Sequence, residues 1–248
     1  MRYFLKLSFN GKNYHGWQIQ QNAHAVQAEL DNALSVLLKE EINTTGCGRT
    51  DTGVHAKIFY AHFDVQAEIE NSGYFRHHIN CLLPHDIAVH NLISVDPRAH
   101  ARFDAVSRTY EYMMYRDKDP FLQEQAYFFP YPLDIEKMNH ACAILKEYED
   151  YSCFSKSRTQ VKTNLCKIEE AYWREDNGQI IFRITANRFL RNMVRAIVGT
   201  MAEIGENKTD ENKFRDIIEG KSRSEAGFSV PAHGLYLVDV RYSFIESE

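Results

Sequence analysis

The sequence predicts an α+β protein whose two halves repeat one order of elements, strand–helix–strand–strand–helix–strand. In short segments apolar residues occupy every second position, as strands require, and between them apolar residues recur at the three-to-four-residue spacing of helices. Mid-chain there is no low-complexity linker, so we expect the halves to form one continuous structure. Hydrophobic residues make up 44% of the 248 residues and charged residues 25%, which allows a substantial core and argues against disorder.

The first half begins with a strand, because apolar residues alternate from Tyr3 to Phe9. Apolar residues at helical spacing from Val26 to Leu37 then predict an amphipathic helix. A short stretch near Ile42–Thr45 could form a strand, ahead of a glycine-rich loop. The remaining elements of this half are a strand, a helix and a strand, predicted at Phe59–Val65, Phe75–Leu82 and Ile87–Val95.

The second half repeats this order in pattern, without a repeated residue string. Its predicted elements are, in turn, Ser107–Tyr115, Ile135–Leu145, Leu165–Trp173, Gln179–Ala186, Arg188–Ile204 and Leu235–Tyr242. The turn at 176–178 (Asp-Asn-Gly) joins the two middle strands. Each half therefore has the βαββαβ pattern of a ferredoxin-like fold. We place the boundary near Phe103, which gives an N-terminal subdomain at 1–103 and a C-terminal subdomain at 104–248. The aromatic stretch Arg116–Pro132 is predicted to be a long insertion.

Cysteine and histidine usage indicates a protein without disulfides or a metal site. The five cysteines are odd in number, widely spaced and without a C-x-x-C motif, as in reduced cytosolic proteins. The adjacent His77 and His78 cannot point the same way on a helix, and no His-x-x-x-His occurs. Lys6 interrupts any apolar N-terminal region, and no uncharged run approaches the length of a membrane span. We therefore expect a cytoplasmic protein with no membrane segment.

The net charge of −5 argues weakly against a nucleic-acid partner, but the charge is unevenly distributed. No acid occurs between Asp150 and Glu169, or between Asp176 and Glu203. These two windows contain basic residues at Lys156, Arg158, Lys162, Lys167, Arg183, Arg188, Arg191 and Arg195. In a chain with 34 acids, such windows suggest a positive surface that binds an anion. Chance clustering on solvated faces is the alternative.

The string at 46–56, Gly-Cys-Gly-Arg-Thr-Asp-Thr-Gly-Val-His-Ala, carries the strongest chemical signal. Its glycines permit tight backbone, so Asp51 can project from a strand end into a cleft as a nucleophile or base. The alternative is a turn in which Asp51 caps its own backbone. The string lacks the third glycine of a dinucleotide-binding loop and the Gly-Lys-Ser/Thr of a P-loop.

Asp51-Thr52-Gly53 is also the triplet of aspartic proteases, which need a second carboxylate from an equivalent half or subunit. The second half has no matching triplet. A cationic Arg49 beside such a pair of carboxylates would also oppose their shared proton. The sequence therefore disfavours this class.

Two further patterns supply candidate residues. On the predicted helix at Arg188–Ile204, three arginines recur at i, i+3 and i+7, on a stripe separate from the apolar one. Arg195 lies at the edge of the apolar stripe and is therefore best placed to reach a partly buried carboxylate. These arginines are Arg188, Arg191 and Arg195. On the strand at Ser107–Tyr115, one face carries Arg108, Tyr110 and Tyr112. Tyrosine offers a stacking surface for a base and a phenol for proton transfer. Solvated arginines and a half-buried sheet surface are the alternatives.

Taken with other strings, these residues resemble the tRNA pseudouridine synthase A family over nearly the whole chain. The matching strings are 15–20 (HGWQIQ), 26–27 (VQ), 48–56 (GRTDTGVHA), 83–87 (LPHDI), 100–103 (HARF), 108–112 (RTYEY), 189–195 (FLRNMVR) and 231–237 (PAHGLYL). The departures are small: Asn10-Gly11-Lys12 where the family often has Asp-Gly-Thr, and Arg191-Asn192 where it often has Tyr or His. They bear on RNA contacts.

The resemblance implies two ferredoxin-like subdomains whose sheets join into one extended, mainly antiparallel sheet, with helices on one face and a basic cleft. It also implies a homodimer in which one tRNA contacts both subunits. The implied reaction is isomerisation of uridine to pseudouridine at positions 38, 39 and 40 of the tRNA anticodon stem-loop. No metal or cofactor is implied, since uracil leaves and returns within one pocket.

The resemblance also assigns roles. Asp51 would act on the ribose, and Arg195 would pair with Asp51 and keep it ionised. Tyr110 would stack on the flipped base and serve the proton transfer at C5. Arg49 would help to displace the base and Leu235 would contact the uracil, while we place Arg188 and Arg191 among the substrate-binding residues. A non-catalytic RNA-binding module is the remaining alternative, but the aromatic signature of such modules is absent from the sequence.

Overall fold

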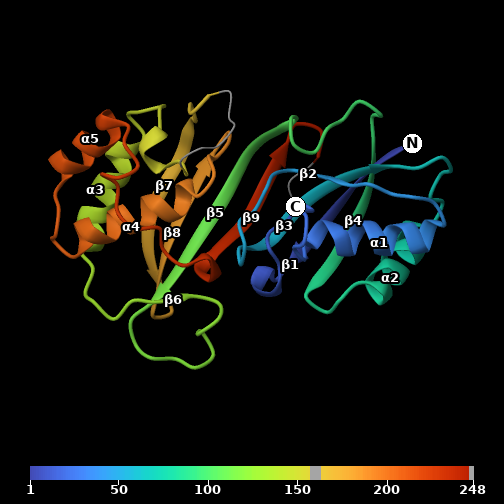
Figure 1. The fold of residues 1–248 in the computed structure, drawn as a ribbon, viewed down its shortest axis with the longest axis horizontal. Coiled ribbons are helices and arrows are strands. Elements are labelled where there is room, and N and C mark those ends of the chain that lie inside the picture. Colours follow the sequence, from blue (N-terminus) through green and yellow to red (C-terminus); the bar gives the residue numbers. More distant parts are fainter. Residues whose placement is uncertain (157–162, 246–248) are drawn as a thin grey trace. The chain divides into compact units, whose positions relative to one another are not determined.

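The computed structural model describes residues 1–156 and 163–245, so Arg158 and Lys162 lie outside the described residues. Its strands are mostly antiparallel and alternate with helices along the chain, which confirms the α+β class (Figure 1). The chain forms two compact units. The first comprises Met1–Val106 and the C-terminal residues from Tyr236, and the second comprises Ser107–Leu235. No helix in the described ranges is long and apolar enough to cross a membrane.

The first unit is built on three long antiparallel strands with β1 in the centre. These strands are β1 (Arg2–Phe9), β3 (His55–Asp64) and β4 (Ile87–Val95), and β1 pairs with both others. Because β1 occupies one edge of β3, the two short partners of β3 share its other edge. They are β2 (Thr45–Gly46), which is antiparallel, and the start of β9 (Leu235–Tyr242), which is parallel. The order β4-β1-β3-β2 is the ferredoxin-like arrangement predicted for the first half.

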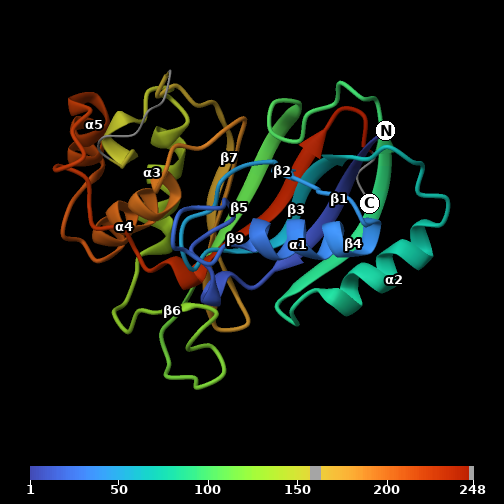
Figure 2. The same cartoon turned by 45° about the vertical axis from the view of Figure 1, so that its right-hand side comes forward.

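Two helices, α1 (Val26–Leu38) and α2 (Ser72–Leu82), complete the first half and pack on each other (Figure 2). Helix α2 begins where the Asn71 side chain accepts a hydrogen bond from the Tyr74 N–H at 2.8 Å. The Phe75 ring of α2 stacks on Phe63 of β3, with ring centroids 6.4 Å apart. The odd-numbered face of β3 is therefore the face that packs on α2.

C-terminal residues cover part of the opposite face of the first unit. The ring of Tyr242, on β9, lies 5.3 Å from Phe4 and 5.2 Å from Tyr60, both in edge-to-face geometry. The Tyr242 hydroxyl donates to the carbonyl oxygen of Ala101. These contacts bury Phe4 completely.

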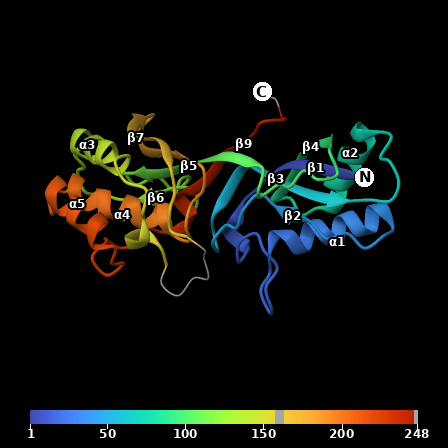
Figure 3. The same cartoon turned by 90° about the horizontal axis from the view of Figure 1, so that it is seen from above.

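The second unit has its own antiparallel strands in the order β5-β8-β7, with the short β6 parallel to the end of β5. Their bounds are β5 (Ala105–Tyr115), β6 (Tyr127–Phe128), β7 (Ile168–Asp176) and β8 (Gln179–Ala186). Three helices lie together in this unit (Figure 3): α3 (Ile135–Leu145), α4 (Met193–Gly205) and α5 (Glu211–Gly220). The sequence predicted the first two of these helices and missed α5.

Trp173 contacts both the strands and the helices of the second unit. Its backbone N–H and carbonyl are bonded by the side-chain amide of Asn139, on α3, at 2.8 and 3.1 Å. Its ring packs 4.8 Å from Phe182 of β8, and its indole N–H points at the sulfur of Met201, on α4, at 3.3 Å. Helix α4 is buried along almost its whole length, so it forms the centre of this unit.

Several predicted boundaries were wrong: strand β3, for example, begins at His55 rather than Phe59. Helix α4 begins at Met193 rather than Arg188, because Asn192 adopts a left-handed conformation with φ of 68°. Arg188 and Arg191 therefore lie in irregular chain ahead of the helix, and the predicted arginine stripe does not exist. Strand β7 begins at Ile168 rather than Leu165, and β2 is Thr45–Gly46 rather than Ile42–Thr45. Within the stretch predicted as an insertion, 116–132, the structure adds the short β6.

Candidate active site

Asp51 lies in the loop at 47–54, between β2 and β3, and is partly exposed. Its carbonyl oxygen accepts a hydrogen bond from the Val54 N–H at 3.2 Å, which closes a tight turn. Gly53 within this turn has φ of +79°, a conformation that residues with a Cβ rarely adopt. The glycine that follows Asp51 thus serves the backbone geometry inferred from the sequence.

The chain at 11–17 packs directly against this loop. At Gly16, with φ of +87°, an added Cβ would lie 2.2 Å from the carbonyl oxygen of Thr50, and at Gly11 it would lie 1.9 Å from that of Val54. The Trp17 N–H donates to the Thr50 hydroxyl at 3.0 Å. Backbone therefore lies against backbone on the residues either side of Asp51, and the loop has little room to move.

The chain at 11–17 is itself held in place by Tyr14 and Asp86. The Tyr14 carbonyl accepts a hydrogen bond from the Gly53 N–H at 3.2 Å, and the Tyr14 hydroxyl donates one to Asp86 at 2.5 Å. Burial and the Asp86 carboxylate raise the pKa of Tyr14, so the phenol stays a donor. Asp86 also accepts from Asn13 at 3.2 Å. Asp86 lies in one of the strings recognised in the sequence, at 83–87, whereas Tyr14 and Asn13 lie in none, and the supporting role of all three was missed.

Tyr110 and Tyr112 lie on the same face of β5, as predicted from their alternation. Tyr110 is partly exposed and meets the ring of Phe189 edge to face, with centroids 5.1 Å apart. Tyr112 is fully buried and donates to the carbonyl of Pro231 at 2.8 Å. Burial raises the pKa of Tyr112, which suits a structural donor and not a proton-transfer group. Of the two phenols, Tyr110 is the one with access to a substrate.

Arg195 lies in the first turn of α4 and is partly buried. Its Nε donates to the carbonyl of Val230 at 2.7 Å, and the Val230 N–H donates back to the Arg195 carbonyl at 3.3 Å. Burial lowers the pKa of His233, and the cation of Arg195 lowers it further. The guanidinium is thus anchored at Nε, which fixes the plane that contains its other N–H groups.

Leu235 is buried at the start of β9, next to this anchor. The 3₁₀ turn Ala232–Gly234 precedes it and packs on the Tyr112 ring, where a Cβ at Gly234 would lie 2.8 Å from the ring. One segment of chain, from Val230 to Leu235, therefore bonds Arg195, packs on Tyr112 and carries Leu235.

The remaining predicted residues occupy less constrained positions. Arg49 is exposed in the Asp51 loop of the first unit, and Arg191 is exposed ahead of α4 in the second. Arg188 is partly buried near Cys166, where burial raises the pKa of the thiol to about 11 and the Arg188 cation opposes the rise. The Lys156 N–H donates to the Arg191 carbonyl at 3.0 Å. This bond brings together the two acid-free windows recognised in the sequence.

Comparison with known proteins covers nearly the whole chain. A family model described as tRNA pseudouridine synthase matches residues 144–243, which include Arg195 and Leu235. The tRNA pseudouridine synthase A of Parabacteroides distasonis is 50% identical over 241 residues, which is 97% of this chain and 96% of that protein. The proteins of the same name from Bacteroides fragilis and Francisella tularensis are 48% and 37% identical, over 97% of this chain and 96% and 93% of their own lengths.

The chain belongs to the tRNA pseudouridine synthase A family. It is therefore an enzyme of the isomerase class. The resemblance stated from the sequence is confirmed, and both alternatives, an aspartic protease and a non-catalytic RNA-binding module, are excluded by this membership.

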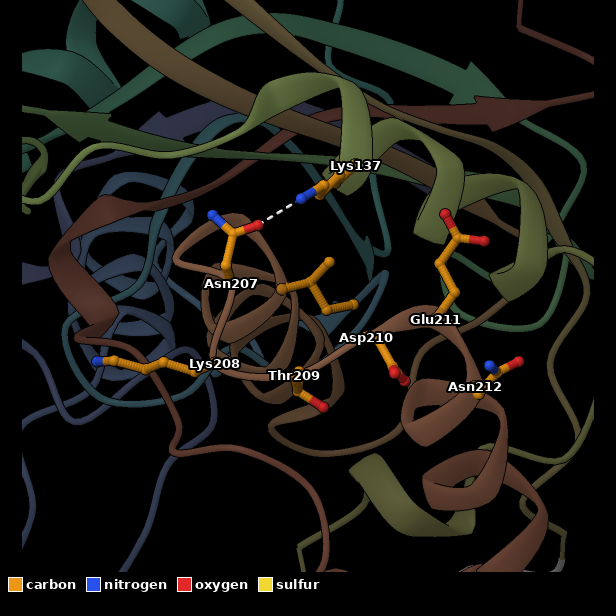
Figure 4. A pocket seen from close by; sticks show the side chains of 8 residues that line it. Lys137, Asn207, Lys208, Thr209, Asp210, Glu211 and Asn212 are labelled. Atoms are coloured by element: carbon orange, nitrogen blue, oxygen red, sulfur yellow. Dashed lines mark hydrogen bonds between the residues drawn. The ribbon is translucent and has the colours of Figure 1, made fainter.

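A polar pocket of about 500 Å³ lies elsewhere in the second unit, beside the start of α5 (Figure 4). Of its lining residues, Lys137 donates to Asn207 through its ammonium, and Lys208 pairs at 2.8 Å with Glu206, which does not line the pocket. None of the predicted site residues lines this pocket. Among the described residues no group of three or more His, Cys, Asp or Glu side chains could hold a metal ion.

Proposed function

We propose that this isomerase converts uridine to pseudouridine at positions 38, 39 and 40 of the tRNA anticodon stem-loop, with Asp51 as its nucleophile. The observation that carries the proposal is the Asp51 loop, in which backbone contacts at Gly11 and Gly16 hold a partly exposed carboxylate in one place. The names of the relatives support the tRNA substrate.

The reaction breaks the bond between N1 of uracil and C1′ of ribose, turns the base and joins C5 to C1′. The Asp51 carboxylate would either attack C1′, as in a retaining glycosidase, or remove the proton of the neighbouring carbon. In both cases a carboxylate at a fixed distance from the ribose lowers the barrier, because little orientation entropy remains to be lost. A loop clamped by Gly16 and Tyr14 meets this requirement.

Arg195 would pair with Asp51. A carboxylate enclosed in a uridine pocket loses solvation, which raises its pKa and favours the unreactive neutral acid. A guanidinium offsets this because it stays charged at any working pH. The bond from Arg195 to the Val230 carbonyl uses Nε, and the terminal amino groups carry the other four N–H donors.

The other residues would handle the base. Tyr110 would stack on the flipped uracil and serve the proton transfer at C5, and its edge-on contact with Phe189 orients the ring for this. Leu235 would supply apolar contact to the uracil, and Arg49 would displace the base from its stack. No cofactor takes part, because the same uracil leaves and returns.

Binding of tRNA would rely on local positive charge, since the chain has a net charge of −5. Arg188 and Arg191 belong to one acid-free window and Lys156 to the other, and the bond between Lys156 and Arg191 makes these windows neighbours. We propose this surface as part of the phosphate-binding region. We also propose a cytoplasmic homodimer in which one tRNA contacts both subunits.

Substitution of Asp51 tests the proposal. Asp51→Asn keeps the size of the side chain and removes its charge, so we expect a folded protein that binds tRNA and forms no pseudouridine. Mass mapping of pseudouridine on tRNA transcripts gives both the activity and the modified positions. The control is Asp216→Asn, an exposed carboxylate on α5, which should leave activity unchanged. Retention of a tenth of the turnover by Asp51→Asn would place the nucleophile elsewhere.

A further inference from the structure

A segment without helix or strand, Ala226–Val230, lies along α4 and is named here the α4 strap. It contacts the helix at both ends. The Gly227 N–H donates to the Thr200 hydroxyl at 2.9 Å, and Val230 exchanges two hydrogen bonds with Arg195. The strap therefore supplies the carbonyl oxygen that anchors the Arg195 guanidinium.

The strap lies directly on the backbone of α4. A Cβ added to Gly199 of the helix would lie 1.8 Å from the Phe228 carbonyl oxygen, and one added to Gly227 would lie 2.9 Å from Thr200. Such close approach leaves no side chain between strap and helix to absorb a shift. A displacement of the strap is consequently a displacement of the Val230 carbonyl.

Arg223 holds the strap together from outside the helix. One terminal nitrogen of its guanidinium donates to the carbonyls of Ala226 and Gly227 at 3.2 and 3.0 Å. The other donates to the Ser229 hydroxyl at 2.8 Å. That hydroxyl also accepts from the side-chain amide of Asn192, the residue before α4, at 2.6 Å. A single planar cation thus connects three strap residues to the start of the helix.

We propose that Arg223 is a positioning residue for Arg195: it fixes the strap, and the strap fixes the guanidinium that the proposed function pairs with Asp51. The inference rests on the proposed function in one respect, the pairing of Arg195 with Asp51. Without Arg223, the carbonyls of Ala226 and Gly227 turn to water and the strap gains freedom. Arg195 then samples other orientations, and its charge no longer offsets the desolvation of the carboxylate.

The test compares Arg223→Met and Arg223→Lys with Arg215→Met. Arg215 is a matched control, because it also uses both terminal nitrogens, here to Glu147 at 2.5 and 3.0 Å, and among the described residues it makes no hydrogen bond or ion pair to the strap or α4. Activity is measured as release of tritium from tRNA labelled at C5 of uridine, over a range of pH. We expect Arg223→Met to lower kcat about tenfold with little change in KM. Arg223→Lys should lie between Arg223→Met and the wild type.

The pH profile separates positioning from mere stabilisation. Weaker compensation of a desolvated carboxylate favours its neutral form, so the acidic limb of kcat should move to higher pH in Arg223→Met. It should move further in Arg195→Met, and the double variant should match Arg195→Met alone, because Arg223 acts through Arg195. Arg215→Met should keep the wild-type limb. Melting curves correct each kcat for the folded fraction.

Each other outcome is decisive. If Arg195→Met moves the acidic limb and Arg223→Met does not, the positioning role is wrong while the proposed function stands. A further loss in the double variant would also overturn the inference, because Arg223 would then act independently of Arg195. If Arg195→Met itself leaves the limb in place, the pairing of Arg195 with Asp51 is wrong and the role of Arg223 fails with it.

Discussion

The Asp51 loop and the α4 strap each hold a functional side chain, but they are held by different means. In the loop, backbone presses on backbone at Gly11 and Gly16, where any side chain would overlap a carbonyl oxygen. The strap also has a glycine contact, but its end beside Arg195 is held by the side chains of Arg223 and Asn192. Any side chain added at Gly11 or Gly16 overlaps a carbonyl oxygen and displaces the backbone at once. Side-chain hydrogen bonds, by contrast, can be removed one at a time, at a cost of about 1 kcal/mol each. Damage should therefore be abrupt in the loop and graded in the strap.

The largest effect is expected at Gly16. In Gly16→Ala the new Cβ would lie 2.2 Å from the Thr50 carbonyl oxygen at a residue with φ of +87°, a strain of roughly 1–3 kcal/mol or more that is relieved only if the Asp51 loop and the chain at 11–17 move apart. We expect turnover to fall at least ~100-fold, since a displacement of about 1 Å can cost this much. The control is Gly48→Ala in the same loop, where a Cβ meets nothing within 4 Å. Turnover within twofold of wild type for Gly16→Ala would show that the loop is not clamped.

An intermediate effect is expected at Tyr14, which bonds the loop through its carbonyl and Asp86 through its hydroxyl. Tyr14→Phe removes only the bond to Asp86 and should cost about 1–2 kcal/mol in unfolding free energy, with kcat several-fold lower. Tyr148→Phe is the matched control, because that hydroxyl donates to Glu219 at 2.8 Å far along the chain from the loop. Denaturant unfolding and turnover are measured together. Equal effects of the two substitutions on kcat would argue against a role for Tyr14 in holding the loop.

The smallest effect is expected at Ser229 in the strap. Ser229→Ala removes the hydroxyl that joins Arg223 to Asn192 but leaves the two bonds from Arg223 to strap carbonyls. We expect a drop of about twofold in kcat, because one bond of several is lost. Ser224→Ala, whose hydroxyl bonds only Ser222 among the described contacts, serves as control. A loss as large as that of Arg223→Met would show that the hydroxyl, and not the guanidinium, fixes the strap.

The spacing of apolar residues predicted helices and strands best where no distant contact interrupts the local pattern. The strands Gln179–Ala186 and Leu235–Tyr242 were predicted to the residue, because alternation and flanking turn residues agree there. Helix α4 was predicted to begin too early, since the apolar spacing continues back through Leu190 in helical phase. The left-handed Asn192 interrupts it, and the bond from Asn192 to Ser229 spans 37 positions. No local signal could reveal that bond.

The residues of the candidate site show the same difference between local and long-range signals. Asp51 could be singled out from its sequence because glycines beside a lone acid mark special backbone. Its supports could not, because the bond between Tyr14 and Asp86 joins residues 72 positions apart and is fixed only by the packed sheet. Likewise the ion pairs of Glu111 with Arg174 and Arg183, both at 3.1 Å, follow from strand register and not from any motif.

The contacts of Tyr242 have a consequence for the order in which the protein folds during synthesis. Its hydroxyl reaches Ala101, 141 positions earlier, and its ring covers Phe4 and Tyr60. A ribosome therefore releases the first hundred residues before the rings of Phe4 and Tyr60 can be covered, and these rings stay open to chaperones or to misassociation until translation has passed Tyr242. Contacts of such long sequence separation form late and slow folding, so the N-terminal unit, although made first, is completed last.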